Sequence, residues 1–284
     1  VNGAAGLREL LAMEDCPLRS RARFDAGPFP MLQLHRRIDG RDFWWLANNT
    51  AEERSCRLRL RGARGRAEVW DCESGAMRPV ASRDTAQGAQ VALRFRPYEA
   101  FWLVLDPARP AVSAPPPPAL RPVGAVVGTW TWRIDPARQP KLPHPIALPA
   151  ELTATGGAQW PLGSWNACGL DRFSGWVEYE TRLKWSGPSR GVVLDLGRVA
   201  HMATVEVNGR PAGSRLWPPF QFDVAAHLRP GTNRIRVRVG NLLANNMGET
   251  AEAGLFGPVR LLRPAAAIGA SPSRPDDAKK GTRH

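Results

Sequence analysis

Acidic side chains in the second half of the chain could supply general acid and base chemistry. Hydrolysis of a glycosidic bond needs two carboxylates that flank the bond in a cleft, one of them protonated. The candidates are Glu178, Glu180, Asp195, Glu206, Asp223, Glu249 and Glu252. Glu178, Glu180 and Glu206 alternate with apolar residues, which is typical of the solvated face of a strand, and a small filled sandwich seldom offers a cleft. We therefore predict no catalytic residue here. No Gly-x-Ser-x-Gly elbow, phosphate loop or dinucleotide fingerprint indicates another enzyme class.

Tryptophan is the other chemically informative residue, with 11 in 284 residues. An indole stacks on the apolar face of a sugar ring, and its N–H can bond a hydroxyl. The tryptophans within strand-like runs are predicted to fill the core, and they are Trp70, Trp102, Trp130 and Trp132. The loop residues Trp160, Trp165, Asn166 and Trp217 are the candidates for ligand contact. Two interpretations of these loop residues are open: they contact sugar, or they dock onto a neighbouring domain.

The elements that must position these residues are strands. Between Trp176 and Leu242, apolar and polar residues alternate, as in Ile235, Val237 and Val239 among arginines. Asn208-Gly209 predicts a tight hairpin turn without a ligand role, and Pro230-Gly231 breaks the chain before the last long strand. The pattern predicts an antiparallel β-sandwich.

The whole chain divides into segments by composition. Residues 1–23 carry a short helical pattern and are predicted to be the tail of a preceding domain. Residues 24–107 contain strand-like runs separated by Gly and Pro and predict a small β-sandwich. Residues 108–122, with Pro115–Pro118, predict an extended linker, with a proline-rich partner ligand as the alternative. Residues 123–264 form the second sandwich, and 265–284 predict a disordered tail. The predicted class is all-β, with two β-sandwich domains.

Charge, cysteine content and length narrow the function further. The formal charge is +13, but the arginines are scattered and no nucleic-acid module is present, so we expect a solvated basic surface and no nucleic-acid partner. Four cysteines without metal-ligand spacing predict free buried thiols and no zinc, with a Cys56–Cys72 pair across neighbouring strands as the alternative. No apolar run is long enough for a membrane span. A chain of 284 residues is too short for a (β/α)8 barrel of about 250 residues plus the sandwich, so we expect a C-terminal piece of something longer, or a processed form.

Ordered segments of the second sandwich resemble a known family. They are Phe173–Trp176, Leu194–Val199, Val205–Gly209, Trp217–Val224, Leu228–Asn233 and Val239–Asn246. Together they resemble the galactose-binding-like jelly roll of glycoside hydrolase family 2 and, more closely, the C-terminal β-sandwich of family 106-like α-L-rhamnosidases. In the first region His35–Arg37, Phe43–Asn48 and Glu68–Gly75 look like the domain that precedes that jelly roll.

The resemblance implies a set of sugar-contacting residues and partners. In family 2 enzymes, polar residues after the Phe-Ser-Gly-type segment and after the last long strand help to hold the sugar. The matching positions are Asp171, Arg172, Ser174, Asn241, Asn245 and Asn246. The jelly roll here follows family 106 order, not family 2 order. The implied partners are carbohydrate and the catalytic barrel of the same polypeptide, in an extracytoplasmic compartment. No cofactor is implied, although jelly rolls of this kind commonly hold a structural calcium.

Two hypotheses follow for the function. The first is that these are accessory, non-catalytic domains of a glycoside hydrolase, which support carbohydrate binding and the substrate cleft of the barrel. The second is a stand-alone adhesion module that binds carbohydrate or protein, which the positive charge would allow. Under the first hypothesis the loop end that carries Trp165, Asp171 and Asn246 contacts sugar with a dissociation constant on the order of millimolar, because an open rim encloses little of a ligand.

Overall fold

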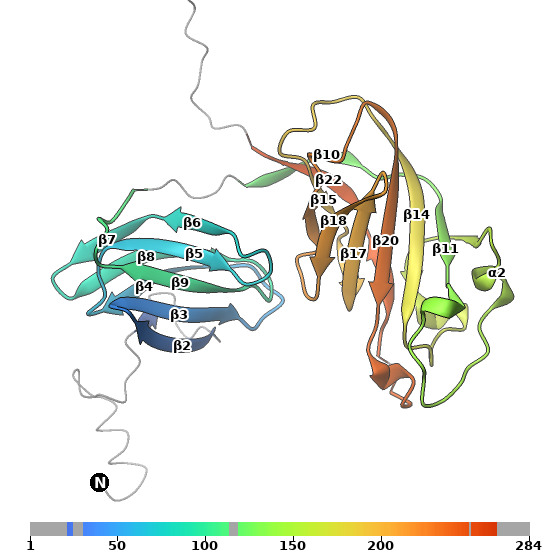
Figure 1. Ribbon diagram of the computed structural model, residues 1–284, viewed down its shortest axis with the longest axis horizontal. Coiled ribbons are helices and arrows are strands. Elements are labelled where there is room, and N and C mark those ends of the chain that lie inside the picture. The colour runs from blue at the N-terminus through green and yellow to red at the C-terminus, as the bar shows by residue number, and fades with distance from the viewer. Residues whose placement is uncertain (1–21, 25–30, 114–118, 250, 266–284) are drawn as a thin grey trace, which may run out of the picture.

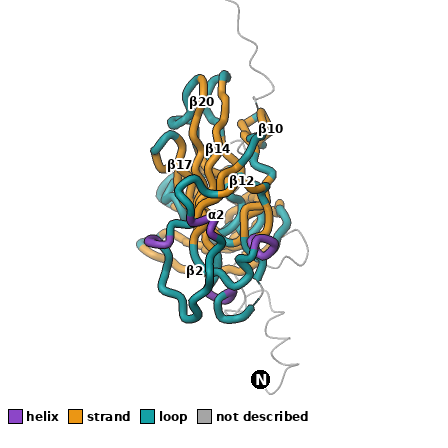
Figure 2. Tube along the Cα trace, turned by 90° about the vertical axis from the view of Figure 1, so that its right-hand side faces the viewer, coloured by secondary structure: helices purple, strands orange, loops and turns teal. Residues whose placement is uncertain are grey.

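The computed structural model describes residues 22–24, 31–113, 119–249 and 251–265. Almost all of its regular structure is β-strand, and the predicted all-β class with β-sandwich architecture is confirmed (Figure 1). Helices in the described part of the chain are single short turns (Figure 2). The expectations for residues 1–21, for Pro115–Pro118 and for residues 266–284 lie outside the described residues.

Two antiparallel sheets make up the first sandwich. The five-stranded sheet runs, in spatial order, through β2 (Met31–Ile38), β3 (Arg41–Asn48), β9 (Ala100–Asp106), β5 (Arg66–Asp71) and β6 (Met77–Val80). The four-stranded sheet runs through β1 (Ala22–Phe24), β4 (Arg54–Arg61), β8 (Gly88–Phe95) and β7 (Ser82–Thr85). The strand-like runs found in the sequence correspond to β2, β3, β4, β5, β8 and β9, whereas the short strands β1, β6 and β7 were not predicted.

Alternation along each strand decides which side chains form the first core. Trp44 and Leu46 of β3 point inward, as do Phe101, Leu103 and Leu105 of β9, and all five are buried. The residues between them point to the outer face of the sheet. Trp102 lies between Phe101 and Leu103, and Trp70 follows buried Val69, so both indoles lie on the outer face and are half-buried. The prediction that Trp70 and Trp102 belong to the core is therefore wrong.

Three antiparallel sheets make up the second sandwich. The six-stranded sheet runs through β12 (Ala158–Trp160), β11 (Trp130–Arg133), β14 (Trp176–Trp185), β20 (Gly231–Gly240), β17 (Met202–Val207) and β18 (Arg210–Arg215). A four-stranded sheet comprises β10 (Leu120–Ala125), β22 (Arg260–Pro264), β15 (Val193–Asp195) and β19 (Gln221–Asp223). A three-stranded sheet comprises β13 (Gly163–Ser164), β21 (Gly254–Gly257) and β16 (Arg198–Ala200).

Short helical turns complete the second sandwich: η1 (Pro136–Arg138), α2 (Ala150–Thr153), η2 (Trp165–Cys168) and η3 (Leu243–Asn245). A single hydrophobic core lies between the sheets and includes Trp130 and Trp132, as predicted. Asn208 and Gly209 adopt φ values of 53° and 80° in the β17–β18 hairpin, which confirms the predicted turn. No helix among the described residues is long and apolar enough to cross a membrane.

The segment between the sandwiches differs from the prediction at its C-terminal end. β10 begins at Leu120, inside the range predicted as linker, and Pro122 pairs in register with Leu262 of β22. Proline is tolerated there because β10 is an edge strand and its free side needs no N–H donor. The sandwiches also contact each other through polar side chains: Arg215 pairs with Glu73, and Arg96 Nη1 donates to Gln221 Oε1 at 3.4 Å.

Gly254 is one of the positions where packing requires glycine. It adopts φ +142°, and a Cβ there would lie 2.2 Å from the carbonyl oxygen of Gly163, its neighbour on β13. We predict that Gly254→Ala lowers the free energy of unfolding by about 3–5 kcal/mol, because backbone must shift in addition to the conformational strain. Gly209→Ala is the control: it has a positive φ but no atom within 4 Å of the added Cβ, so a loss of about 1–2 kcal/mol is expected. Thermal and urea unfolding measure both. Equal losses would contradict the packing argument.

Candidate functional site

The candidate site lies at one end of the second sandwich, where the long central strands begin and end. β14 and β20 pair antiparallel with Trp176 opposite Gly240. The loop that precedes β14 and the loop that follows β20 are therefore neighbours in space, although about 70 residues separate them in sequence. This register brings together Asp171, Arg172, Ser174, Asn241, Asn245 and Asn246, as the resemblance implied.

Ser174 and Asn241 join these two loops from the inside. The Ser174 hydroxyl donates to the Leu242 carbonyl at 2.8 Å and accepts from the backbone N–H of Asn246 at 3.0 Å. Asn241 accepts from the Gly175 N–H at 2.9 Å and donates to the Phe173 carbonyl at 2.7 Å. Both side chains are buried, and their polar groups bond to backbone. Their role in this structure is to position the loops.

Asn246 and Asn245 extend the same arrangement, and both are fully buried. Asn246 Nδ2 donates to the carbonyls of His144 at 2.7 Å and Arg172 at 3.2 Å, and its Oδ1 accepts from the His144 N–H at 3.0 Å. Asn245 Nδ2 donates to the carbonyls of Ala251 at 2.6 Å and Asp171 at 3.4 Å. We call Ser174, Asn241, Asn245 and Asn246 the loop clamp. The side chains of the loop clamp bond to backbone. Contact between these side chains and a sugar stays a prediction, and in three of the four residues no polar atom is left unpaired for it.

Asn245 is the exception, because its Oδ1 is buried without a hydrogen-bond partner among the described residues. The half-buried Asn166 has an Oδ1 in the same condition. Unpaired buried acceptors of this kind cost free energy unless a water or ligand satisfies them.

Trp165 lies beneath the loops instead of at their surface. Its side chain is 0% exposed, its Nε1 donates to Tyr179 Oη at 2.5 Å, and its ring packs against Phe173 with centroids 5.7 Å apart. Burial raises the pKa of Tyr179, since the phenolate would be desolvated there. The predicted stacking role of Trp165 is thus corrected: the indole has no free face and belongs to the core. η2 begins immediately after the Ser164 cap and turns the ring inward.

Asp171 and Arg172 are the exposed members of the predicted set at this end. Their backbone carbonyls are held by Asn245 and Asn246, which leaves the carboxylate and guanidinium in solvent above a fixed backbone. The guanidinium can donate hydrogen bonds to hydroxyl groups of a ligand, and the carboxylate can accept them.

Trp217 lies apart from this loop cluster. It follows β18 at the far edge of the six-stranded sheet, with β17 between β18 and β20. Two residues before Trp217, Arg215 pairs with Glu73 of the first sandwich. Trp217 is half-buried beside this contact between the sandwiches. The structure therefore does not bring Trp217 together with the other predicted residues.

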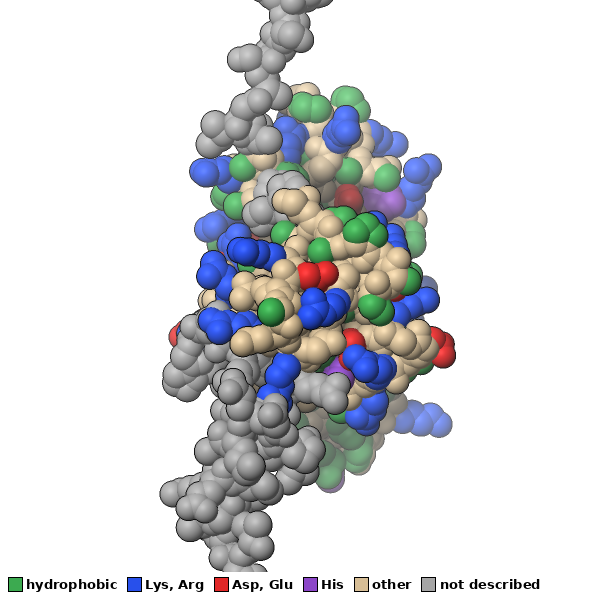
Figure 3. All heavy atoms as spheres, turned by 90° about the vertical axis from the view of Figure 1, so that its left-hand side faces the viewer, with side chains coloured by type: hydrophobic (Ala, Val, Ile, Leu, Met, Phe, Trp, Pro, Cys, Tyr) green, Lys and Arg blue, Asp and Glu red, His purple; other side chains and the backbone are tan. Residues whose placement is uncertain are grey.

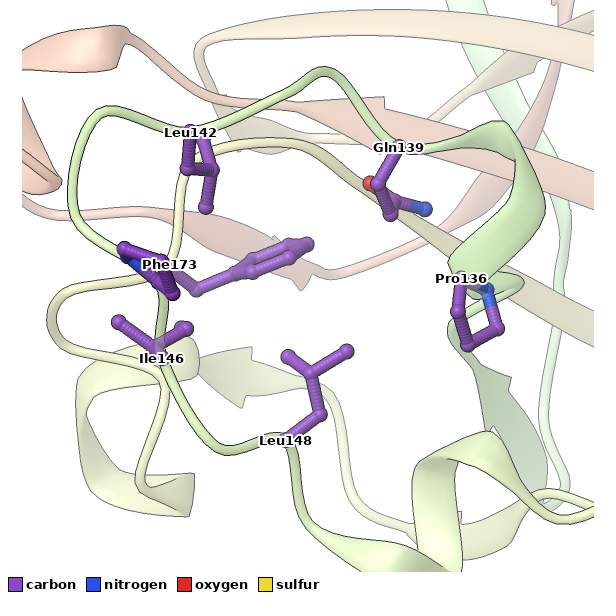
Figure 4. Close-up of a pocket in the computed structure, with 7 residues that line it drawn as sticks. Pro136, Gln139, Leu142, Ile146, Leu148 and Phe173 are labelled. Carbon is purple, nitrogen blue, oxygen red and sulfur yellow. The ribbon is translucent and has the colours of Figure 1, made fainter.

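An apolar pocket beside the loop clamp was not predicted from the sequence. It has a volume of about 200 Å³ and is lined by Pro136, Gln139, Leu142, Pro145, Ile146, Leu148 and Phe173 (Figure 4). The Gln139 side chain is held by the backbone of Trp176 and Asp135. The nearby loop exposes Leu242, Leu243 and Met247, at 44%, 52% and 58%. The sequence feature that could have predicted this pocket is the proline-rich run 136–149, because such a run cannot form regular strands and has to pack as irregular chain.

The acidic candidates on the strands form an ion-pair ladder on the outer face of the six-stranded sheet. Glu178 pairs with Arg133 at 2.8 Å, Glu180 with Arg234 at 2.9 Å, and Arg236 reaches Glu178, Glu180 and Glu206 at 3.3–3.5 Å. All three glutamates lie on the outer face of the sheet, as the alternation predicted, where they are half-buried and paired with arginines. Within the described ranges no group of three or more His, Cys, Asp and Glu could hold a metal ion.

The cysteines differ partly from expectation. Cys56 is buried, Cys168 is free and half-buried, and Cys72 is free and exposed. The prediction of a buried thiol is thus wrong for Cys72, while Cys16 lies outside the described residues. Basic side chains are spread over the face shown in Figure 3 and do not gather in one stripe.

The chain is similar to glycoside hydrolases. It aligns with the structure of a rhamnosidase from Novosphingobium sp. PP1Y at 25% identity and a TM-score of 0.65, over 91% of this chain and 26% of that chain. A protein of Formosa agariphila named "Putative beta-glucuronidase" is 32% identical over 122 residues, which is 37% of this chain and 10% of that protein. No protein-family model matches the sequence. The chain thus spans about a quarter of the rhamnosidase and a tenth of the curated relative.

Proposed function

We propose that this chain supplies the accessory, non-catalytic sandwich domains of a glycoside hydrolase, and that the second sandwich is a sugar-binding jelly roll. The observation that carries the proposal is the alignment of both sandwiches together, over 91% of the chain, with part of a rhamnosidase. Similarity confined to one sandwich would have suited a mobile binding module equally well. A shared two-sandwich unit favours domains that work next to a catalytic domain.

The exposed end of the second sandwich is the part that we assign to this role. Asp171 and Arg172 provide charged hydrogen-bonding groups, and the backbone that carries them is fixed by Asn245 and Asn246. Apolar surface lies beside them, in the pocket around Phe173 and on Leu242, Leu243 and Met247. This rim combines polar groups with apolar surface. Such a surface is suited to form one wall of a substrate cleft, with a neighbouring domain as the other wall.

Weak sugar binding at this end is the first test. Because an open rim encloses little of a ligand, we expect L-rhamnose and uronate oligosaccharides to bind the isolated chain with dissociation constants on the order of millimolar. NMR titration should shift resonances of residues 166–175, and Arg172→Ala or Asp171→Asn should remove the shifts. Arg190→Ala is the matched control, since Arg190 is also exposed but follows β14 at the opposite end. Shifts that persist in Arg172→Ala and Asp171→Asn would contradict the assignment.

The loop clamp provides a second prediction. Asn246→Ala leaves the carbonyls of His144 and Arg172 and the His144 N–H without partners, so we expect a loss of about 2–4 kcal/mol of unfolding free energy. Amide hydrogen exchange of residues 142–146 and 171–175 should accelerate before the sheets open. Asn166→Ala is the control within the same end, because no side-chain hydrogen bond of Asn166 is lost. A smaller loss in Asn246→Ala than in Asn166→Ala would show that the clamp does not position these loops.

A further inference from the structure

The outer face of the five-stranded sheet in the first sandwich carries a continuous apolar row. Strand register places Leu34 opposite Trp45, Trp45 opposite Trp102, Trp102 opposite Trp70, and Trp70 opposite Met77. The row thus crosses all five strands, from β2 to β6, over a distance of about 19 Å at the usual strand spacing. Leu34 and Met77 are exposed at 41% and 63%, and the three indoles between them are half-buried. We call these five residues the aromatic row.

The two sides of the aromatic row differ. On one side Phe43 packs edge-on against Trp70 and Trp102, with ring centroids 5.6 Å and 6.3 Å away. On the other side the adjacent register positions are Ala47 and Ala100, whose methyl groups are far smaller than an indole. The indoles therefore present apolar surface next to a strip of small side chains. Hot spots for protein partners are typically compact clusters surrounded by polar groups. A row with one open flank lacks this shape and suits a linear ligand better.

The polar border of the aromatic row lies on the Phe43 side and is predominantly basic. Arg36 is opposite Phe43, and Glu68 is bound by Arg66 at 3.0 Å and Arg109 at 2.9 Å. Arg41 lies 3.8 Å from Asp106 in the next position. The guanidinium groups of Arg36, Arg41, Arg66 and Arg109 outnumber the carboxylates of Glu68 and Asp106. This border complements a ligand that carries carboxylates.

We propose that the aromatic row is a binding site for an extended acidic glycan, a chain of pyranose rings that includes uronates. The apolar faces of successive rings lie on Trp45, Trp102 and Trp70, and their carboxylates face the basic border. This site is distinct from the loop end of the second sandwich and goes beyond the function proposed above, which assigns no ligand to the first sandwich. Indole faces supply apolar area at a low cost in conformational entropy, and guanidinium groups bind carboxylates through paired N–H donors.

Affinity electrophoresis of the whole chain tests the proposal, with polygalacturonate in one gel and neutral hydroxyethylcellulose in another. We expect retardation by polygalacturonate, a weaker effect of the neutral chain, and about tenfold or greater loss of affinity in Trp45→Ala/Trp102→Ala. Trp45→Phe/Trp102→Phe keeps aromatic faces and should retain most of the affinity, which separates lost stacking from lost folding. Trp176→Ala, a half-buried indole on the second sandwich, and Arg190→Ala, an exposed arginine that follows β14 away from the loop end, should bind as the unaltered chain does.

Cys72 gives an independent readout, because its exposed thiol directly follows β5, the strand that carries Trp70, on the side of the open flank. Partial burial raises the pKa of this thiol, so alkylation is best followed at mildly alkaline pH. Bound polygalacturonate should slow alkylation of Cys72 several-fold and leave Cys168 unchanged. The proposal is overturned if polygalacturonate does not retard the chain, if the double alanine variant binds equally well, or if the neutral chain binds as tightly. It is also overturned if the chain sediments as a dimer that Trp45→Ala/Trp102→Ala converts to monomer, since a second copy would then cover the row.

Discussion

The register between β14 and β20 is the constraint on which the second sandwich depends. Each strand is 10 residues long, and every residue of one is paired with a residue of the other. Val177, Tyr179 and Leu183 point into the core on β14, and Val237 and Val239 do so on β20. A slip by one residue would turn these side chains to solvent and bring the arginines and glutamates of the ladder into the core, at a cost of many kcal/mol. The same register places Trp176 opposite Gly240, and so it decides which two loops meet at the candidate site.

Alternation along the strands was enough to predict the all-β class and the position of most strands, because one buried face imposes a period of two. It was also enough to place Glu178, Glu180 and Glu206 outside. The orientation of Trp70 could have been read in the same way, since Glu68 shares its parity on β5 and a carboxylate favours the outer face. Trp102 offered no such signal. In Phe101–Leu105 every residue is apolar, so alternation cannot distinguish the two faces, and only the pairing with β3 and β5 fixes them.

The loop residues were harder to predict for a different physical reason. Asn241, Asn245 and Asn246 are polar side chains in a loop, and a sequence does not reveal whether such amides meet solvent or backbone. Here the two loops cross the end of a closed core, so their buried carbonyls and N–H groups need partners, and asparagine amides provide both a donor and an acceptor. Trp165 is buried by the same requirement, because its ring closes the core beneath the clamp next to Phe173. Residues that resemble ligand contacts in sequence thus serve as the support for their exposed neighbours Asp171 and Arg172.

The two sandwiches solve the problem of an uncovered sheet face in opposite ways. On the six-stranded sheet, Arg236 is shared among three glutamates, and this neutral, hydrated ladder has little tendency to associate. On the five-stranded sheet, three indoles occupy the equivalent outward positions, although polar residues there would leave the inner core unchanged. Half-exposed indoles in a continuous row forgo the hydrophobic stabilisation that full burial would give, and they add a risk of association. Because the fold of the first sandwich is already maintained by its inner face, the composition of the outer face is most simply explained by binding, and the basic border beside it specifies the charge of what is bound.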